Sequence, residues 1–318
     1  MATEASAHPT VATQAVRIGD QVVGGTRLPV FAGPDRGAHV GHWSMRRHHG
    51  APSARAELAR VRDLSAAPLV VEPFSAADLA AITTYADGIL VGAASMQDFR
   101  LLSAVGRVGL PVVVQRGHHA TVDEWLSSVE YFVAAGCRDI VLCETGSRTH
   151  LSTSRPTIDL ALIREVRERS GHPIVVDVSH SPHLAAAAVS AGADGVFLGE
   201  DAETAEVAAA MDATTLLTPV VRPVNPASLG GCREAIDRVD ATLATLLEYR
   251  ATLAGEVQKH KPVGGHAGRD PRREREIVRQ MSVRAPRLGT ERLSAIMSVV
   301  IGTGLDLSEA AAPHLPRS

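Results

Sequence analysis

Residues 111–146 read PVVVQRGHHATVDEWLSSVEYFVAAGCRDIVLCETG, and this stretch decides the fold. A short Val-rich run is followed by a polar turn, a helical stretch and then a second apolar run. Apolar runs without strict alternation are typical of strands that are buried on both faces. Their alternation with helical stretches favours a parallel sheet.

The same alternation extends over residues 28–200. The other strand-like runs are LPVFAG at 28–33, PLVVEP at 68–73, DGILVG at 87–92, PIVVDVSH at 173–180 and DGVFLGE at 194–200. Together these runs predict an α/β fold that closes as a right-handed, TIM-like (β/α)8 barrel. An eighth strand is expected in HVGHWSM at 39–45. Because almost no room remains for the helix before it, the sequence leaves open a barrel that is incomplete near its first helix.

The chain has the composition of an ordinary globular protein. Its 318 residues allow one large domain or two unequal ones, and 45% of them are apolar while 21% are charged. A net charge of −3 and a pI near 6.5 give no basic field, so nucleic acid and anionic membranes are not expected as partners. Small molecules are the expected partners.

We expect a cytoplasmic protein with reduced cysteines. No apolar run approaches the roughly 18–20 residues that span a bilayer, and the opening MATEASAHPT lacks the basic and apolar regions of a signal peptide. The cysteines, Cys137, Cys143 and Cys232, show no CxxC spacing. Neither a disulfide framework nor a zinc knuckle is therefore predicted.

A Pro- and Gly-rich stretch at 218–231, TPVVRPVNPASLGG, breaks the rhythm and is interpreted as a linker. Beyond it, apolar periodicity predicts a long helix from Cys232 to His260 and two shorter helices near 271–284 and 290–302. The long helix carries more apolar surface than the short ones can cover, so we expect a helical homodimer. The predicted organisation is a tail at 1–26, a barrel at 27–217, the linker, an all-α domain at 232–309 and a tail at 310–318.

Charged residues at regular spacing mark a candidate site in the helical domain. Arg250 and Lys261 are eleven residues apart, about three helical turns, so both project from one face around a small ligand. Arg233 lies about 25 Å from Arg250 by helix rise, and it can complete the site only in the neighbouring protomer. The charged cluster after the helix comprises Asp270, Arg272, Arg273 and Glu274.

The segment CREAIDRVDATLATLLEYRATLAGEVQKHK, with the later RDPRREREIV, resembles the all-helical chorismate mutase family of intertwined dimers. The resemblance covers residues 232 to about 309, and its charged positions are Arg233, Asp240, Arg250, Lys261, Asp270, Arg273 and Glu274. It implies conversion of chorismate to prephenate without a cofactor, because this unimolecular rearrangement needs only positioning and electrostatics.

The resemblance also implies a role for each charged residue. The two substrate carboxylates would be bound by Arg250 and by Arg233 of the other chain, with support from Arg273. Lys261 would donate to the ether oxygen, and Asp270 and Glu274 would hold the ring hydroxyl.

One part of the last helix departs from the family pattern. The family carries a Gln or Glu there as a second donor to the ether oxygen, but the alignment places Ser308 at this position, with Glu309 beside it and Gly304 where a small hydroxyl residue usually sits. Three alternatives stay open: Glu309 acts as a protonated donor, the rate is reduced, or the substrate is a relative such as 4-amino-4-deoxychorismate.

Residues 27–215 resemble the type I-beta branch of 3-deoxy-D-arabino-heptulosonate 7-phosphate (DAHP) synthase. The resemblance rests on YADGILVGAASMQDFRLLSAVG, on residues 112–150, and on SRPTIDL and VVDVSHS. It implies condensation of phosphoenolpyruvate with erythrose 4-phosphate at a divalent metal, Mn²⁺ or Mg²⁺. Fusion of this synthase to a helical mutase is a recurring arrangement.

The metal ligands that the family implies are eroded in this chain. Asp35 stands where the family has a Cys ligand, and His180 retains the second ligand. The acidic third ligand falls on Gly199, with Glu200 one residue late, and the fourth aligns near Ala210, with Asp212 two residues away. We therefore predict no functional metal site, with vestigial candidates Asp35, His180 and Glu200.

The implied substrate site is eroded as well, because three family cations are replaced by Gln115, Thr145 and Ala94. Its retained residues are Arg116, Glu144, Arg148, Arg155 and Asp177. The family's loop for the sugar phosphate has no clean counterpart, but a basic tetrad lies nearby, namely Arg46, Arg47, His48 and His49. The alternative interpretation is that these four residues form a solvated loop. Three lost charge-assisted contacts amount to about three to six powers of ten in binding or rate.

The sequence thus predicts a chorismate mutase that carries a degenerate, non-condensing DAHP synthase-like barrel with a scaffold or regulatory role. One alternative is an active bifunctional enzyme of the shikimate pathway, in which Asp35, His180, Glu200 and Asp212 rebuild the metal site. The other is a mutase acting on 4-amino-4-deoxychorismate in specialised metabolism.

Overall fold

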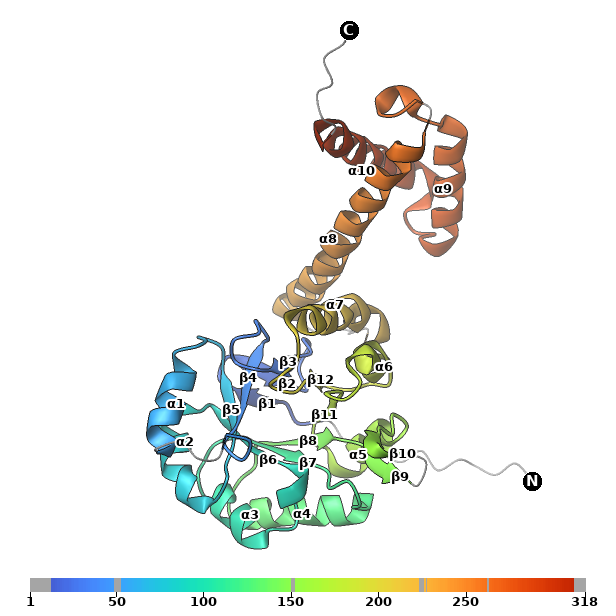
Figure 1. Cartoon of the computed structure of the whole chain (residues 1–318). Helices are drawn as coiled ribbons and strands as arrows, with labels where there is room; N and C mark the ends of the chain where they lie inside the picture. Colours follow the sequence, from blue (N-terminus) through green and yellow to red (C-terminus); the bar gives the residue numbers. More distant parts are fainter. Residues whose placement is uncertain are drawn as a thin grey trace, which may run out of the picture. The chain divides into compact units, whose positions relative to one another are not determined.

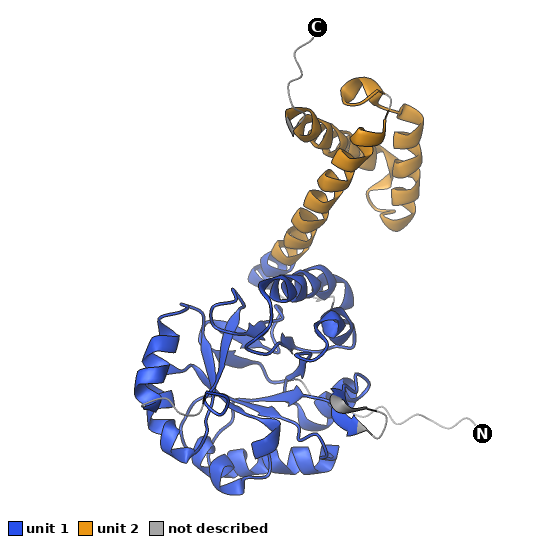
Figure 2. Cartoon of the chain, viewed as in Figure 1, with its two compact units in different colours: residues 1–235 blue, residues 236–318 orange. Residues whose placement is uncertain are grey.

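The structure, a computed structural model, describes residues 13–48, 53–149, 152–222, 226, 228–261 and 263–311. The chain divides into two compact units, residues 1–235 and residues 236–318 (Figure 2). The described part of the first unit contains a barrel, and the described part of the second unit is helical.

Eight parallel strands close into the barrel of the first unit (Figure 1). Their order around the barrel is β11, β12, β3, β4, β5, β6, β7 and β8, and β8 pairs with β11 to close the ring. The strands are β3 Val30–Ala32, β4 Val40–Ser44, β5 Leu69–Glu72, β6 Gly88–Val91, β7 Val112–Gln115, β8 Ile140–Glu144, β11 Ile174–Asp177 and β12 Gly195–Phe197. The predicted barrel is confirmed, and β4 is the strand expected within residues 39–45.

Helices surround the barrel and connect its strands (Figure 1). They are α1 Ala54–Arg62, α2 Leu79–Tyr85, α3 Phe99–Gly106, α4 Val122–Ala134, α5 Leu162–Ser170, α6 Ala185–Ser190 and α7 Thr204–Val221, with short 3₁₀ helices η1 Ala76–Asp78, η2 Ala93–Ser95 and η3 Pro182–Leu184. Residues 33–39, between β3 and β4, form turns and bends instead of a helix. The sheet is therefore complete, and only the helical layer lacks its first member.

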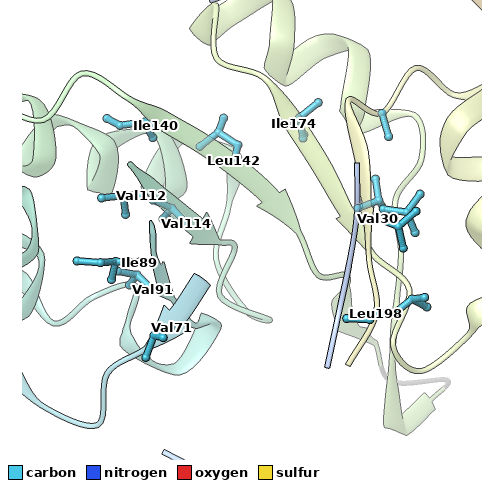
Figure 3. Close-up of a cluster of buried hydrophobic side chains, with 14 of the residues drawn as sticks. Val30, Val71, Ile89, Val91, Val112, Val114, Ile140, Leu142, Ile174 and Leu198 are labelled. Atoms are coloured by element: carbon cyan, nitrogen blue, oxygen red, sulfur yellow. The ribbon is translucent and has the colours of Figure 1, made fainter. Parts of the chain in front are cut away.

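Side chains of the barrel strands alternate between two apolar layers. On β7, Val112 and Val114 belong to the layer between strands and helices, whereas Val113 belongs to the layer inside the barrel. Ile140 and Leu142 of β8 join the outer layer in the same way (Figure 3). Because both faces are buried, the strands appear in the sequence as continuous apolar runs.

The inner layer becomes polar at the carboxyl ends of the strands. The alternation that places Val113 inside the barrel also turns Gln115 inward two residues later, and Asp177 follows Val175 in the same way on β11. Glu72 ends β5, and Ser44 ends β4. The fold thus gathers polar side chains at the end of the barrel where barrel enzymes keep their active sites.

Two antiparallel hairpins are added to the barrel. In the first, β1 (Val16–Ile18) pairs with β2 (Gln21–Val23), and its apolar side chains join the inner layer of the barrel. Because residues 1–26 were predicted to be a tail, the hairpin corrects this prediction for residues 16–23. The second hairpin, β9 (Ser147–Thr149) with β10 (Ser152–Thr157), follows β8.

The helical domain begins with α8, Leu229–His260, which matches the predicted long helix. It continues with η4 His266–Gly268, α9 Pro271–Arg284 and α10 Gly289–Ala311, and α10 is longer than expected. Val278, Leu293 and Met297 form a small core between α9 and α10. Since α7 runs through Pro219 to Val221 and α8 starts at Leu229, the segment between the two helices is shorter than the predicted linker 218–231.

The apolar stripe of α8 is exposed in the single chain, and no described residue of this helix is buried. Leu243 and Leu246 are each 49% exposed, and the other large apolar side chains of the stripe are Ile236, Val239, Leu247, Leu253 and Val257. A homodimer would bury this stripe. It stays a prediction, because the structure contains a single chain.

Among the described residues, one helix is long and apolar enough to cross a membrane. It is the Gly289–Ala310 part of α10, with a mean hydropathy of 1.3 over its best window. This finding corrects the expectation that no apolar run approaches a spanning length. It is weak as an indication of a membrane protein, because a core helix of a globular protein passes the same test.

Candidate active site

A pocket of about 310 Å³ lies in the helical domain and contains most of the predicted site residues. Arg250 and Lys261 reach it from α8 and the residue that follows it. Asp270, Arg273 and Glu274 reach it from the start of α9. Its apolar lining comes from Leu253, Ala254, Val257, Ile277, Ile301 and Leu305.

The two carboxylates of the pocket are held by the first turn of α9. Asp270 caps this helix, because its Oδ1 accepts the backbone N–H groups of Arg272 at 2.9 Å and Arg273 at 3.1 Å. The Arg273 N–H also lowers the pKa of Asp270 below its ordinary value. Glu274 accepts two hydrogen bonds from Arg269, and this contact lowers the pKa of Glu274. Both groups are therefore ionised at neutral pH.

Cations outnumber carboxylates in the pocket. Arg250, Lys261, Arg269 and Arg273 face Asp270 and Glu274, which leaves a surplus of two positive charges. Lys261 Nζ donates to the Gly268 carbonyl at 2.8 Å, and Arg250 Nη1 lies 3.5 Å from the Val300 carbonyl. Within the described part of the chain, Arg250 and Lys261 thus donate only to neutral carbonyl groups, so a ligand with two carboxylates suits the pocket.

Several predicted residues lie outside this pocket. Arg233 is exposed near the start of α8, and Asp240 is exposed on the same helix. Ser308 Oγ donates to the Gly304 carbonyl at 2.9 Å, and exposed Glu309 accepts the His266 N–H at 2.9 Å. Neither Ser308 nor Glu309 is among the described residues that line the pocket.

Two polar residues that line the pocket were missed by sequence reasoning. Arg269 directly precedes the predicted Asp270, and Gln258 lies in the last turn of α8, three residues before Lys261. Gln258 Oε1 accepts the Gly265 N–H at 3.0 Å and so fixes the turn that follows α8. The position of Arg269 beside the motif was the only available signal.

In the barrel, the retained Arg116 and Glu144 form a buried ion pair. The Arg116 guanidinium donates to both Glu144 oxygens, at 2.6 and 2.5 Å, and Glu144 is fully buried. The remaining Arg116 nitrogen, Nη1, donates to Ala120 O at 3.0 Å and Ser147 Oγ at 2.8 Å. Four of the five guanidinium N–H groups thus have partners within the chain, and the two that face Glu144 are held by a buried carboxylate.

The residues that replace family cations are also engaged within the chain. Gln115 Nε2 donates to Asp177 Oδ2 at 3.0 Å, and Gln115 Oε1 accepts the Ala93 N–H at 3.1 Å. Thr145 Oγ1 donates to the Arg116 carbonyl at 2.6 Å. Burial raises the pKa of Asp177, which agrees with its neutral partner Gln115.

Glu200 and the turn after β4 form a second polar cluster at the barrel mouth. A Glu200 oxygen accepts the Ser44 N–H, and the other lies 2.7 Å from His48 Nε2 and 3.9 Å from Arg47 Nη1. Burial raises the pKa of Glu200. Among the described residues, neither ring nitrogen of buried His42 has a hydrogen-bond partner, and burial lowers the pKa of His42 to about 3.

The described residues do not assemble a metal site. Asp35 is 56% exposed and lies 3.3 Å from Arg36 Nε, and His180 is exposed. Glu200 has both oxygens occupied by Ser44 and His48, and Asp212 is exposed on α7. No three His, Cys, Asp or Glu side chains in the described part of the chain converge closely enough to bind one ion.

A further cavity of about 680 Å³ lies beside the barrel mouth, where Ala94, His118, His119 and Arg148 contribute to its lining. Arg148 is exposed, and its backbone N–H donates to the His118 carbonyl at 3.0 Å.

Arg155 belongs to β10, but its side chain lies outside the described residues, as does His49 of the predicted tetrad. Arg46 Nη2 donates to Ser95 Oγ at 2.9 Å.

Comparison with known families assigns both parts of the chain. Residues 47–221, more than half of the sequence, match the DAHP synthetase I family. The chain belongs to this family. Residues 232–309 match the chorismate mutase type II family, so a DAHP synthetase I domain is fused to a chorismate mutase domain. Both resemblances drawn from the sequence are confirmed.

Curated relatives are similar to the synthetase domain. One is the phospho-2-dehydro-3-deoxyheptonate aldolase of Thermotoga maritima, 39% identical over 137 residues, which make up 41% of this chain and 40% of that protein. Another is a 2-dehydro-3-deoxyphosphooctonate aldolase of Nitratidesulfovibrio vulgaris, 31% identical over 159 residues, covering 44% of this chain and 57% of that protein. The chain thus spans about half the length of the curated relatives it matches.

Solved structures of the Thermotoga maritima synthase share the barrel fold. The crystal structure of its phospho-2-dehydro-3-deoxyheptonate aldolase (DAHP synthase) has a TM-score of 0.60 and 26% identity, covering 67% of this chain and 76% of that chain. A truncated form of 3-deoxy-D-arabino-heptulosonate 7-phosphate synthase from the same organism has a TM-score of 0.54 and 30% identity, covering 59% of this chain and 80% of that chain.

Proposed function

We propose that the chain converts chorismate to prephenate in its helical domain. The observation that carries this proposal is the pocket that unites Arg250, Lys261, Asp270, Arg273 and Glu274 with a surplus of positive charge. Chorismate is a compact dicarboxylate, and its rearrangement needs no nucleophile and no proton transfer. A positively charged pocket with a partly apolar wall provides positioning and electrostatic stabilisation.

In this proposal, each charged side chain has one task. Arg250 binds a substrate carboxylate, with support from Arg273, and Lys261 exchanges the Gly268 carbonyl for the ether oxygen, where negative charge develops. Asp270 and Glu274, both ionised, hold the ring hydroxyl between them, and Glu274 accepts its single hydrogen. Ser308 and Glu309 remain candidates for a second donor to the ether oxygen.

The proposed enzyme is a homodimer whose site is completed by Arg233 from the other chain. Arg233 is seventeen residues before Arg250 on one continuous helix, so it cannot reach the pocket of its own protomer. The exposed apolar stripe of α8 supports pairing of two copies. We place this protein in the cytoplasm, as a metabolic enzyme of two fused domains.

Loss of chorismate absorbance tests the proposal directly. The Arg250→Ala variant loses one charge-assisted contact of about 1.5–3 kcal/mol, so kcat/KM should fall about 10- to 150-fold. Lys259→Ala is a suitable control, because Lys259 is 68% exposed and pairs with Glu256 away from the pocket. A wild-type protein as inert as Arg250→Ala would refute the proposal.

We further propose that the barrel does not condense phosphoenolpyruvate with erythrose 4-phosphate and acts as a scaffold or regulator of the mutase. The internal partners of Arg116, Gln115 and Glu200 support this, because they occupy groups that substrates or a metal would need. The protein incubated with Mn²⁺ and both substrates should not consume phosphoenolpyruvate. Metal-dependent consumption that disappears in His180→Ala would establish the bifunctional alternative instead.

The regulatory part of this proposal has its own test. Residues 222–318, expressed alone and verified as helical by circular dichroism, should differ from the full chain in mutase kcat/KM or in the response to phenylalanine and tyrosine. Identical efficiency and identical responses would remove the need for a regulatory barrel.

A further inference from the structure

Arg269 and Glu274 form a two-point ion pair at the edge of the mutase pocket. Arg269 Nε donates to Glu274 Oε1 at 2.9 Å, and Arg269 Nη2 donates to Glu274 Oε2 at 2.8 Å. Both side chains line the pocket and are partly buried, with 32% and 24% of their surfaces exposed. This geometry fixes the plane of the carboxylate and holds a guanidinium against both of its oxygens.

The pair has a chemical consequence for what Glu274 can accept. Each carboxylate oxygen has two lone pairs, so after the Arg269 bonds both oxygens can still accept a hydroxyl hydrogen. The charge of Glu274, however, is balanced by the guanidinium. A ligand ammonium at the same place would gain little net attraction and would lie close to a second cation.

We propose that Arg269 is a positioning and specificity-determining residue of the mutase site. It orients Glu274, and it favours a ligand with a neutral hydroxyl on its ring over a ligand with an ammonium at the same position. This inference depends on the proposed mutase function, and it decides between chorismate and 4-amino-4-deoxychorismate as the substrate class. The Arg269 guanidinium would repel a ligand ammonium, while the oriented Glu274 carboxylate would accept a hydrogen bond from a ligand hydroxyl, so selection combines repulsion with attraction.

The surrounding charges agree with this role. Apart from the ion pair, the pocket contains Arg250, Lys261 and Arg273 against the single carboxylate of Asp270. A dianionic ligand with a neutral hydroxyl fits this balance better than one with an added positive charge. Without Arg269, Glu274 would lose its bound guanidinium, and the surplus of the pocket would fall from two positive charges to one, so an ammonium would be repelled less at this place.

The test uses the full chain and both substrates, chorismate and 4-amino-4-deoxychorismate. Wild type should prefer chorismate, and Arg269→Met should lower kcat/KM for chorismate about tenfold while shifting the ratio of the two substrates at least about tenfold toward the amine. Arg269→Lys keeps the charge without the two-point geometry, so it should lose activity with chorismate but keep a ratio near that of wild type.

A matched control exists on α9, the helix that carries Glu274. Arg279 donates to both oxygens of Glu276, at 3.1 and 2.9 Å, and Arg279 is 75% exposed. Arg279→Met removes an equivalent ion pair and should leave both activities and their ratio unchanged. Circular dichroism and sedimentation of every variant exclude loss of folding or assembly as the cause.

The pH profile gives a readout that a merely structural role would not move. Removal of the Arg269 contact should let the pKa of Glu274 rise, so the acid limb of kcat/KM for chorismate should shift to higher pH in Arg269→Met. An unchanged substrate ratio and an unchanged acid limb in a folded, active Arg269→Met protein would refute the inference alone. A wild type that prefers the amine would also refute it, whereas inertness toward both substrates would overturn the mutase function itself.

Discussion

Replacing Leu243 by Glu should dissociate the proposed helical dimer and abolish the proposed mutase activity at low protein concentration. Leu243 is 49% exposed in the single chain and lies near the middle of the α8 stripe. Burial of the exposed half contributes about 1 kcal/mol per protomer, taken as half of the value for a complete Leu side chain. Two-fold symmetry doubles this to about 2 kcal/mol per dimer.

The introduced charge adds to this loss. Two unpaired carboxylates would be buried in an apolar interface, at several kcal/mol each before rearrangement. A total loss of at least about 4 kcal/mol corresponds to roughly 1,000-fold weaker association. Because the proposed site takes Arg233 from the other chain, kcat/KM should fall with the dimer fraction.

Sedimentation velocity and initial rates, both measured over a range of protein concentrations, check this prediction. Ala241→Glu is the control, because Ala241 is exposed and lies about 200° around the helix from Leu243. That variant should behave like wild type. If Leu243→Glu were as active as the control at every concentration, neither a stripe-mediated dimer nor a shared Arg233 could be maintained.

Three more outcomes are expected. An equimolar mixture of inactive Arg233→Ala and Lys261→Ala proteins should recover about a quarter of wild-type chorismate turnover after subunit exchange. Half of the dimers are then mixed, and each mixed dimer holds one intact site out of two. No recovery would contradict a shared site. Burial raises the pKa of Glu72, so the folded chain binds this proton more tightly than the unfolded chain, and stability is lost as pH rises from about 4.3 through the raised value. Thermal melts should therefore show that the unfolding free energy of wild type relative to Glu72→Gln decreases with pH across this window. Arg116→Met should lower the free energy of unfolding by about 3–5 kcal/mol, because Glu144 is left buried without its partner. The melting temperature should then drop by about 6–20 °C in scanning calorimetry. An unchanged melting temperature would show that the pair does not stabilise the barrel.

The sequence allowed the barrel to be predicted because its determinants are local. Runs such as Val112–Val114 are apolar on both faces, and their repetition with helices between them specifies a closed parallel sheet. The hairpin of β1 and β2 was not predicted, because three-residue strands carry too little pattern to distinguish them from a tail. Their apolar side chains become meaningful only where they meet the inner layer of the barrel.

The charged pocket was predictable for a similar reason. Arg250 and Lys261 are related by helix geometry alone, and Asp270 and Glu274 belong to the first turn of the next helix. The contact of Arg269 with Glu274 was missed, because it depends on the path of the turn before α9. Local spacing thus predicted several residues that line one pocket, while the pairing of their side chains could be found only in the three-dimensional structure.

The barrel mouth shows why side-chain pairing decides what a list of substitutions means. Gln115 stands where the family has a lysine, yet it also bridges the Asp177 carboxylate and the Ala93 N–H from two other strand ends. Reintroducing a lysine there would leave the Ala93 N–H without its acceptor and would place a cation against Asp177 rather than in an open phosphate site. Thr145 is likewise bound to the Arg116 carbonyl, and Arg116 to Glu144. Because Gln115 and Thr145 each bond to neighbouring groups, reverting either residue to the family cation would first break an internal contact, and we expect that neither single reversion would produce condensation activity.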